Sequence, residues 1–180
     1  DNPPIAEGEK TGAAALSGAL LGKGSANISK DDFNEEVDYI GARMNFGSQY
    51  ASAGGLSQYA ERILELLADA AIHPNFTQEE FEKEQEILIE GLKTNEKSVA
   101  AAAGKVSRAL LYGKDHPKGE FETQESIEGI TLADAKAFYN KAFIPNNAYL
   151  VVVGDVDYKD VKDWVTTFFK DWEKGAALSN

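Results

Sequence analysis

The chain has 180 residues, enough for one domain with a sizeable hydrophobic core. It carries 30 acidic and 18 basic residues, for a formal net charge of -12, so nucleic acid and anionic membranes are excluded as expected partners. The chain has no cysteine, which excludes disulfides, thiolate zinc sites and cysteine nucleophiles.

The hydrophobic pattern predicts many helices and few strands. Apolar residues at helical spacing, bounded by capping residues and by glycine or proline, predict helices over residues 9–21, 29–41, 57–73, 77–94, 99–112, 131–142 and 158–172. The predicted N-caps among them are Ser29, Ser57, Thr77 and Thr131. Strands are predicted at residues 43–52, where side chains alternate, and at residues 148–154, AYLVVVG, where an unbroken apolar run is typical of burial on both faces.

The sequence predicts fewer strands than a stable sheet needs. A stable sheet needs at least three strands, and only two are predicted here, so further strands are expected from other sequence or from another chain. The fold class that follows is α+β. Because the chain opens at Asp1 with neither a methionine nor a signal peptide, residues 1–180 are expected to be a single domain that is part of a longer protein.

The stretch GAAALSGALLGKGS, residues 12–25, has some features of a phosphate-binding loop. Such a loop needs four residues between its first glycine and the Gly-Lys-Ser/Thr group, whereas three residues separate Gly18 from Gly22. Lys23 is also followed by Gly24 instead of a hydroxyl residue. The stretch is therefore interpreted as a buried helix and not as a nucleotide site.

Other candidates for chemistry have structural explanations. His73 and His116 each precede a proline and have no acidic partner at helical spacing, so they are interpreted as structural residues. The glutamates of residues 79–90 are interpreted as a solvated helix face, because Lys83 lies among them. No nucleophile elbow is present. Composition and spacing alone predict an acidic α+β domain without a catalytic centre.

Several sequence segments, taken in chain order, resemble one domain of the pitrilysin/insulinase family of metallopeptidases. They are GAAALSGALLGKGS, DYIGARMNFGSQYAS, ILELLADAAIHPNFTQEEFEKEQEILIEGLK, LYGKDHPKGEF, SIEGITLADAKAFYNKAFIPNNAYLVVVGDV and FFKDW. The resemblance implies a mixed, mainly antiparallel sheet covered by helices, as in one mitochondrial-processing-peptidase-like metallohydrolase domain. It also implies that the N-terminal strands of that domain are missing here.

Members of this family carry the inverted zinc motif His-Xaa-Xaa-Glu-His on the helix before a Gly-Thr turn. With residues 24–25 on that turn, the histidine positions fall on Ala15 and Ala19, and the catalytic glutamate position falls on Gly18. The third ligand, a glutamate on a later helix, falls on Gly91. The resemblance therefore implies a domain with no catalytic residue, no metal ligand and no cofactor, inactive by itself.

The resemblance also implies a peptide-binding strand. In related active domains an edge strand that matches RMNFGSQY adds the substrate as a further strand, main chain to main chain. The positions carried over as substrate-binding are Asn45, Phe46, Gly47 and Ser48. An ordinary edge strand explains the same residues equally well. Glu84 matches a second acid of the family, two helical turns before Gly91.

Two functions follow from this resemblance. The first is a non-catalytic domain that pairs with a zinc-bearing domain, in the same longer chain or as a heterodimer, to enclose and bind peptides for proteolysis. Zinc is then expected in the paired domain or partner. The alternative is a non-enzymatic peptide-binding or assembly scaffold on the same fold. Bacterial members are often periplasmic, which favours that compartment.

Overall fold

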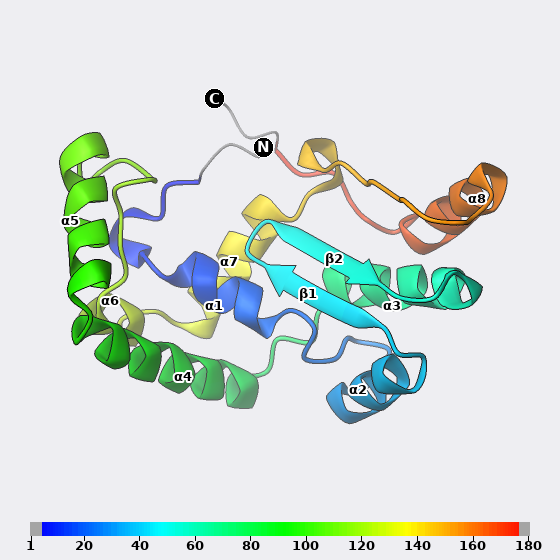
Figure 1. Cartoon of the computed structure of the whole chain (residues 1–180), viewed down its shortest axis with the longest axis horizontal. Helices are drawn as coiled ribbons and strands as arrows, with labels where there is room; N and C mark the ends of the chain where they lie inside the picture. Colours follow the sequence, from blue (N-terminus) through cyan, green and yellow to red (C-terminus); the bar gives the residue numbers. More distant parts are fainter. Residues whose placement is uncertain (1–4, 177–180) are drawn as a thin grey trace.

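The structure is a computed structural model that describes residues 5–176. Its helices are α1 (Ala13–Leu20), α2 (Lys30–Tyr39), α3 (Ala60–Ile72), α4 (Gln78–Glu96), α5 (Val99–Tyr112), α6 (Gln124–Glu128), α7 (Leu132–Ala142) and α8 (Tyr158–Phe168). Strands β1 (Arg43–Gly47) and β2 (Tyr50–Gly54) form an antiparallel hairpin. Figure 1 shows α1 near the centre, with the hairpin on one side and α4 and α5 on the other. The α+β class is confirmed.

Helix starts follow the capping residues of the sequence in most cases. Ser29, Thr77 and Thr131 each accept a hydrogen bond from the backbone N–H three residues later, at 3.2 to 3.3 Å. These bonds satisfy N–H groups that the first turn of a helix leaves unpaired. Ser57 was wrongly predicted as a cap: it lies in a 3-10 turn, and α3 begins three residues later without a side-chain cap.

The strand predicted at residues 43–52 is a hairpin and not one continuous strand. The chain turns at Ser48 and Gln49, so that Gly47 lies opposite Tyr50 and Phe46 lies opposite Ala51. A Cβ on residue 47 would overlap the ring of Tyr50, so a side chain at this position would require that exposed ring to move. The alternating pattern was read correctly as strand, but the turn within it was missed.

The strand predicted at residues 148–154 is not paired. Val151 is 78% exposed and Val153 is 92% exposed, against the expected burial on both faces. Within residues 5–176, the segment 149–153 makes no backbone hydrogen bond. Figure 1 shows it as an extended trace that runs beside β2 in the same direction. The prediction failed because no strand of the described chain pairs with this segment: a groove separates it from β2.

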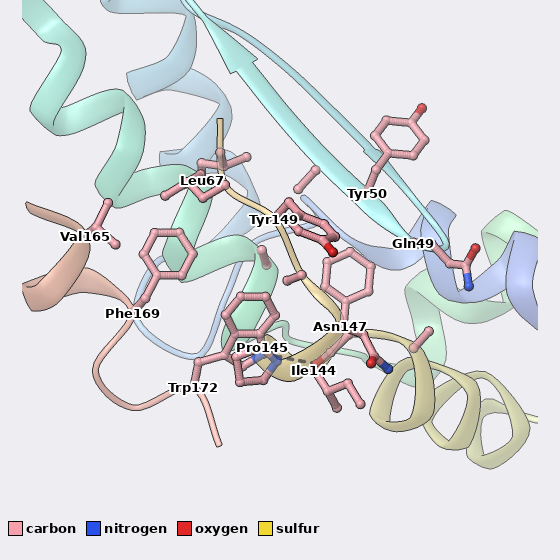
Figure 2. Close-up of a pocket in the computed structure, with 16 residues that line it drawn as sticks. Gln49, Tyr50, Leu67, Ile144, Pro145, Asn147, Tyr149, Val165, Phe169 and Trp172 are labelled. Atoms are coloured by element: carbon pink, nitrogen blue, oxygen red, sulfur yellow. Dashed lines mark hydrogen bonds between the residues drawn. The ribbon is translucent and has the colours of Figure 1, made fainter. Parts of the chain in front are cut away.

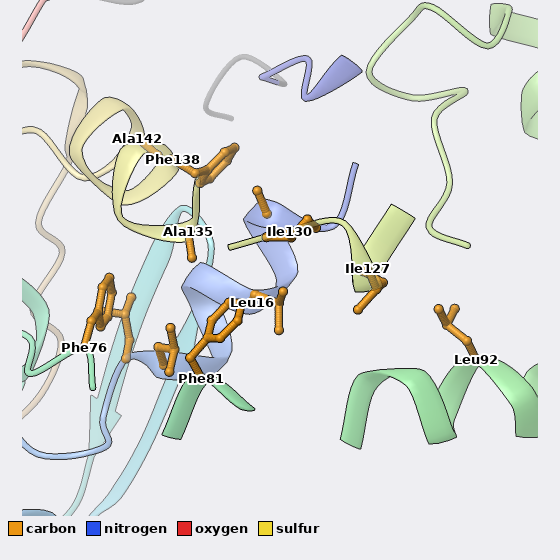
Figure 3. Packing of buried hydrophobic residues seen from close by; sticks show 12 residues of the cluster. Leu16, Phe76, Phe81, Leu92, Ile127, Ile130, Ala135, Phe138 and Ala142 are labelled. Atoms are coloured by element: carbon orange, nitrogen blue, oxygen red, sulfur yellow. The ribbon is translucent and has the colours of Figure 1, made fainter. Parts of the chain in front are cut away.

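The hydrophobic core consists of two clusters that meet at the hairpin. The first surrounds α1 (Figure 3). Leu16 and Leu20 of this helix are both 0% exposed. The cluster is completed by residues from α4, α6, α7 and the connecting loops: Phe76, Phe81, Leu92, Ile127, Ile130, Ala135, Phe138 and Ala142. The second cluster lies between α2, the hairpin and α3, and Phe46 packs against both clusters.

Tyr139 links the two sides of the molecule. It lies on α7, and its hydroxyl donates a hydrogen bond to the backbone carbonyl of Ala71 on α3, at 2.7 Å. Its ring contacts those of Phe76 and Phe143, with centroids 5.3 and 5.4 Å away. Burial raises the pKa of Tyr139 to about 12.

We expect this contact to make stability fall at high pH. The folded state favours the neutral phenol, so the contribution of Tyr139 is complete below the ordinary tyrosine pKa of 10.0 and is lost as pH rises from there to about 12. The slope attributable to Tyr139 is at most about 1.4 kcal/mol per pH unit. Urea unfolding between pH 7 and 11 should show a flatter decline for Tyr139→Phe than for the unmodified chain. Tyr39→Phe, at an exposed tyrosine, is the control and should follow the unmodified chain. An unchanged slope in Tyr139→Phe would contradict the assignment.

Candidate functional site

Small residues on α1 let this helix lie directly against the hairpin. Gly18 is buried, and a Cβ there would lie 2.6 Å from the backbone nitrogen of Ser48 and 2.8 Å from the carbonyl carbon of Gly47. One turn further on, the ring of Phe46 would lie 2.6 Å from a Cβ on Gly22. Backbone atoms cannot move aside as a flexible side chain can, so position 18 accepts only glycine in this arrangement.

A pocket of about 310 Å³ opens beside this contact. Gly18 and Ala19 of α1, Phe46 of β1 and Glu84 of α4 contribute to its lining. Lys23, from the loop after α1, also lines it, and its Nζ lies 2.7 Å from Oε1 of Glu84. The Glu84 side chain is only 13% exposed, so its charge is balanced mainly by this lysine. The sequence prediction did not find this pair, because nothing local to either residue relates Lys23 to Glu84.

The residues around this pocket do not fit a zinc ion. Zinc sites in proteins need three or four ligands from cysteine, histidine or carboxylate, and Ala15, Gly18 and Ala19 offer no such atom. Glu84 is the one acid in the pocket lining, and it is paired with Lys23. Across residues 5–176, no group of three or more potential ligand residues is arranged to hold a metal ion.

Only two of the four positions predicted to match the family's zinc motif lie in the pocket. Gly18 and Ala19 share the pocket with Glu84, whereas Ala15 and Gly91 do not line it. Gly91 lies on the exposed side of α4, and a Cβ there would have no neighbour within 4 Å. The predicted correspondence of these residues to the zinc motif stays a prediction.

The predicted substrate-binding residues lie on β1 and the turn that follows it. Asn45 is exposed, Phe46 faces the pocket, and successive side chains of a strand point to opposite faces. Gly47 ends the strand, and Ser48 lies in the turn with its backbone against Gly18. Within the described residues β1 pairs only with β2, so its other edge has no strand partner there.

His116 and several glutamates of residues 79–90 have local side-chain partners. The ring of His116 stacks on Tyr112 at 5.4 Å, and its Nδ1 accepts a hydrogen bond from the backbone nitrogen of Lys118. Lys30 holds the pKa of Glu80 below its usual range through a hydrogen bond of 2.7 Å. The solvated face predicted for residues 79–90 is correct for Glu79, Glu82, Glu86 and Glu90, which are exposed. It is wrong for Glu80 and Glu84, whose side chains are each 13% exposed and paired with a lysine.

Comparison with known proteins places the chain in a family. Residues 5–116 match the model of the family described as Insulinase (Peptidase family M16), and residues 129–179 match that of the Peptidase M16 inactive domain. The chain belongs to peptidase family M16. The resemblance to the pitrilysin/insulinase family that the sequence segments indicated is thus confirmed.

The similar proteins are longer than this chain. An uncharacterized zinc protease of Mycobacterium leprae is 25% identical over 164 residues, which cover 88% of this M16 chain and 37% of that protein. The crystal structure of a peptidase M16 inactive domain from Pseudomonas fluorescens superposes with a TM-score of 0.84 and 25% identity, over 97% of this chain and 44% of that one. The first half of the periplasmic protease PqqL from Escherichia coli has a TM-score of 0.74 at 16% identity, over 96% and 39% of the two chains. This M16 chain therefore spans less than half the length of each relative.

One further finding concerns membranes. Within the described part of the chain, no helix is both long enough and apolar enough to cross a bilayer.

The contact at Gly18 predicts the effect of placing there the glutamate of the family motif, which the sequence comparison assigns to this position only as a prediction. Gly18→Glu places a side chain against the backbone of Ser48 and should lower the free energy of unfolding by at least about 3 kcal/mol. Gly91→Glu, the matched control in α4, meets no neighbour and should raise stability by about 0.5 kcal/mol through helix propensity. Urea unfolding measures both, and isothermal titration should detect no zinc uptake by either variant. Wild-type stability in Gly18→Glu would show that the contact is not as tight as described.

Proposed function

We propose that this chain is the non-catalytic domain of an M16 metallopeptidase, which pairs with a zinc-bearing domain to enclose and bind peptide substrates. The observation that carries the proposal is the contact between Gly18 and the hairpin turn. This contact occupies the space that a catalytic glutamate would need at the same position of the helix. Peptide hydrolysis then takes place on the paired domain, where the zinc ion is bound.

The lengths of the relatives support the pairing. The chain covers 37% of the Mycobacterium leprae zinc protease and 39% of the Escherichia coli structure, which is itself the first half of a protease. Each relative has room for a second domain of similar size. The paired domain belongs either to the same longer polypeptide or to a partner chain.

The free edge of β1 is the part of this domain that we assign to peptide binding. An extended peptide can add to an exposed strand edge through main-chain hydrogen bonds, with alternate side chains in pockets. The pocket next to Phe46 lies where such a side chain would enter, and Lys23 and Glu84 provide charged groups there. Asn45, Phe46, Gly47 and Ser48 are the proposed contacts.

The pairing can be tested by the mass and metal content of the intact protein, purified gently from its source. Native mass spectrometry should show this domain joined to a second M16 domain, with one zinc ion for each pair. Zinc should stay with the second domain after the two are separated or cleaved apart. A zinc-free monomer or homodimer would contradict the proposal and favour a binding or assembly scaffold.

The peptide site can be tested by hydrogen exchange on the same intact protein. A non-hydrolysable peptide that binds along β1 should slow the exchange of amides in residues 43–47, because it supplies acceptors to the free edge. Amides in α7, which packs mainly against α1, are the internal control and should be unchanged. Peptide binding without slower exchange at residues 43–47 would place the site elsewhere.

A further inference from the structure

The pocket beside α1 combines apolar walls with two opposite charges. The walls come from α2, β1 and the C-terminal end of α1: Leu21, Phe33, Val37, Met44 and Phe46. Lys23 and Glu84 supply the charges, and Asn34 adds an amide. Within residues 5–176, by contrast, no charged residue lines the hollow of about 670 Å³ around Phe169 and Trp172 (Figure 2). The pocket beside α1 can therefore discriminate between side chains by their charge.

This pocket lies on one face of β1. Met44 and Phe46 are two residues apart on the strand, so their side chains point to the same face, and both line the pocket. A peptide that adds to the free edge of β1 continues the sheet, so its residue next to these two points to that face as well. One side chain of a peptide bound along β1 is therefore directed into the pocket.

The two charges in the pocket form one close pair with hydrogen-bonding capacity left over. Nζ of Lys23 lies 2.7 Å from Oε1 of Glu84, and the two side chains are 29% and 13% exposed. In the described part of the chain, the side chains of Glu84 and Asn34 have no further hydrogen-bond partner. An ammonium group has three donors and a carboxylate accepts at both oxygens, so each member of the pair can also bond to a ligand.

A neutral pair of charges disfavours three classes of peptide side chain. An anionic side chain that approaches Lys23 is repelled by Glu84, and a cationic one that approaches Glu84 is repelled by Lys23. An apolar side chain would remove the pair from water without supplying a hydrogen bond, which costs free energy. A side chain without charge that both donates and accepts hydrogen bonds can contact the two groups while the pair stays intact.

We propose that this pocket selects an amide side chain, glutamine or asparagine, in a peptide that is bound along β1. The amide nitrogen donates a hydrogen bond to the carboxylate of Glu84, and the amide oxygen accepts one from Nζ of Lys23. The aliphatic part of the side chain packs against the apolar walls, Phe46 among them. The inference rests on the proposed peptide binding at β1 and adds to it a preference at one peptide position.

Titration of the complete protein with matched peptides tests the preference. Non-hydrolysable peptides in which alanine alternates with glutamine, asparagine, leucine, glutamate or lysine can each direct that second residue into the pocket. Slower amide exchange in residues 43–47 reports binding. The better amide peptide should bind at least about 5-fold more tightly than the leucine, glutamate and lysine peptides. Equal binding by all five would overturn the preference and leave β1 as the peptide site. If no peptide slowed exchange there, the proposed site on β1 would fail, and the preference with it.

Two variants of the complete protein should change the preference in opposite directions. Glu84→Gln leaves Lys23 without its partner, so the glutamate peptide should become the tightest binder by at least about 5-fold. Lys23→Gln leaves Glu84 unpaired, and the lysine peptide should then bind most tightly by a similar factor. Lys93→Gln is the control, because it breaks an exposed pair with Glu90 on the same helix, outside the pocket, and should keep the preference for an amide. An unchanged order of peptides in both pocket variants would overturn the assignment to this pair.

Discussion

The close contact between α1 and the hairpin turn is the constraint on which the rest of this domain depends. Leu16 and Leu20 anchor α1 in the first hydrophobic cluster, while Gly18 meets the backbone of Ser48 on the opposite side. The hairpin can approach this closely only because position 18 has no side chain. The same approach brings Phe46 into contact with both clusters, so the helix, the hairpin and the two halves of the core are fixed together.

This contact also decides what the pocket beside α1 can do. A helix that carried histidine and glutamate side chains on this face would need to stand further from the turn, and the space between would be available to a metal ion. Here the space is closed at Gly18, and what remains is a pocket whose one acid, Glu84, is paired with Lys23. A neutral ion pair attracts neither cations nor anions strongly, so neither the packing nor the electrostatics of this pocket favours a bound metal ion.

Local signals account for what the sequence predicted well. The caps at Ser29, Thr77 and Thr131 and the stop at Gly113, which has a φ of 83°, act within a few residues and were read correctly. Helix α6 was missed, since its five residues are too short for an apolar period, although Thr123 and Ser126 form a capping box. The Gly18 contact and the Lys23–Glu84 pair join parts of the chain that only the tertiary fold brings together, so no local pattern could predict them.

Residues 148–154 show why a failed prediction can still be informative. The run of β-branched residues predicted burial on both faces, and the structure exposes it instead. An exposed apolar strand forgoes about 25 cal/mol of stabilising free energy for each Å² of apolar surface that burial would remove from water. Its unpaired backbone N–H and C=O groups also make no hydrogen bonds within the protein. The same deficit applies to the apolar side chains of α3 and α8 that line the groove between β2 and residues 149–154, and to the edge of β2 that has no strand partner within residues 5–176. The sequence pattern is therefore that of a strand paired on both sides, whereas within residues 5–176 this segment has no backbone partner.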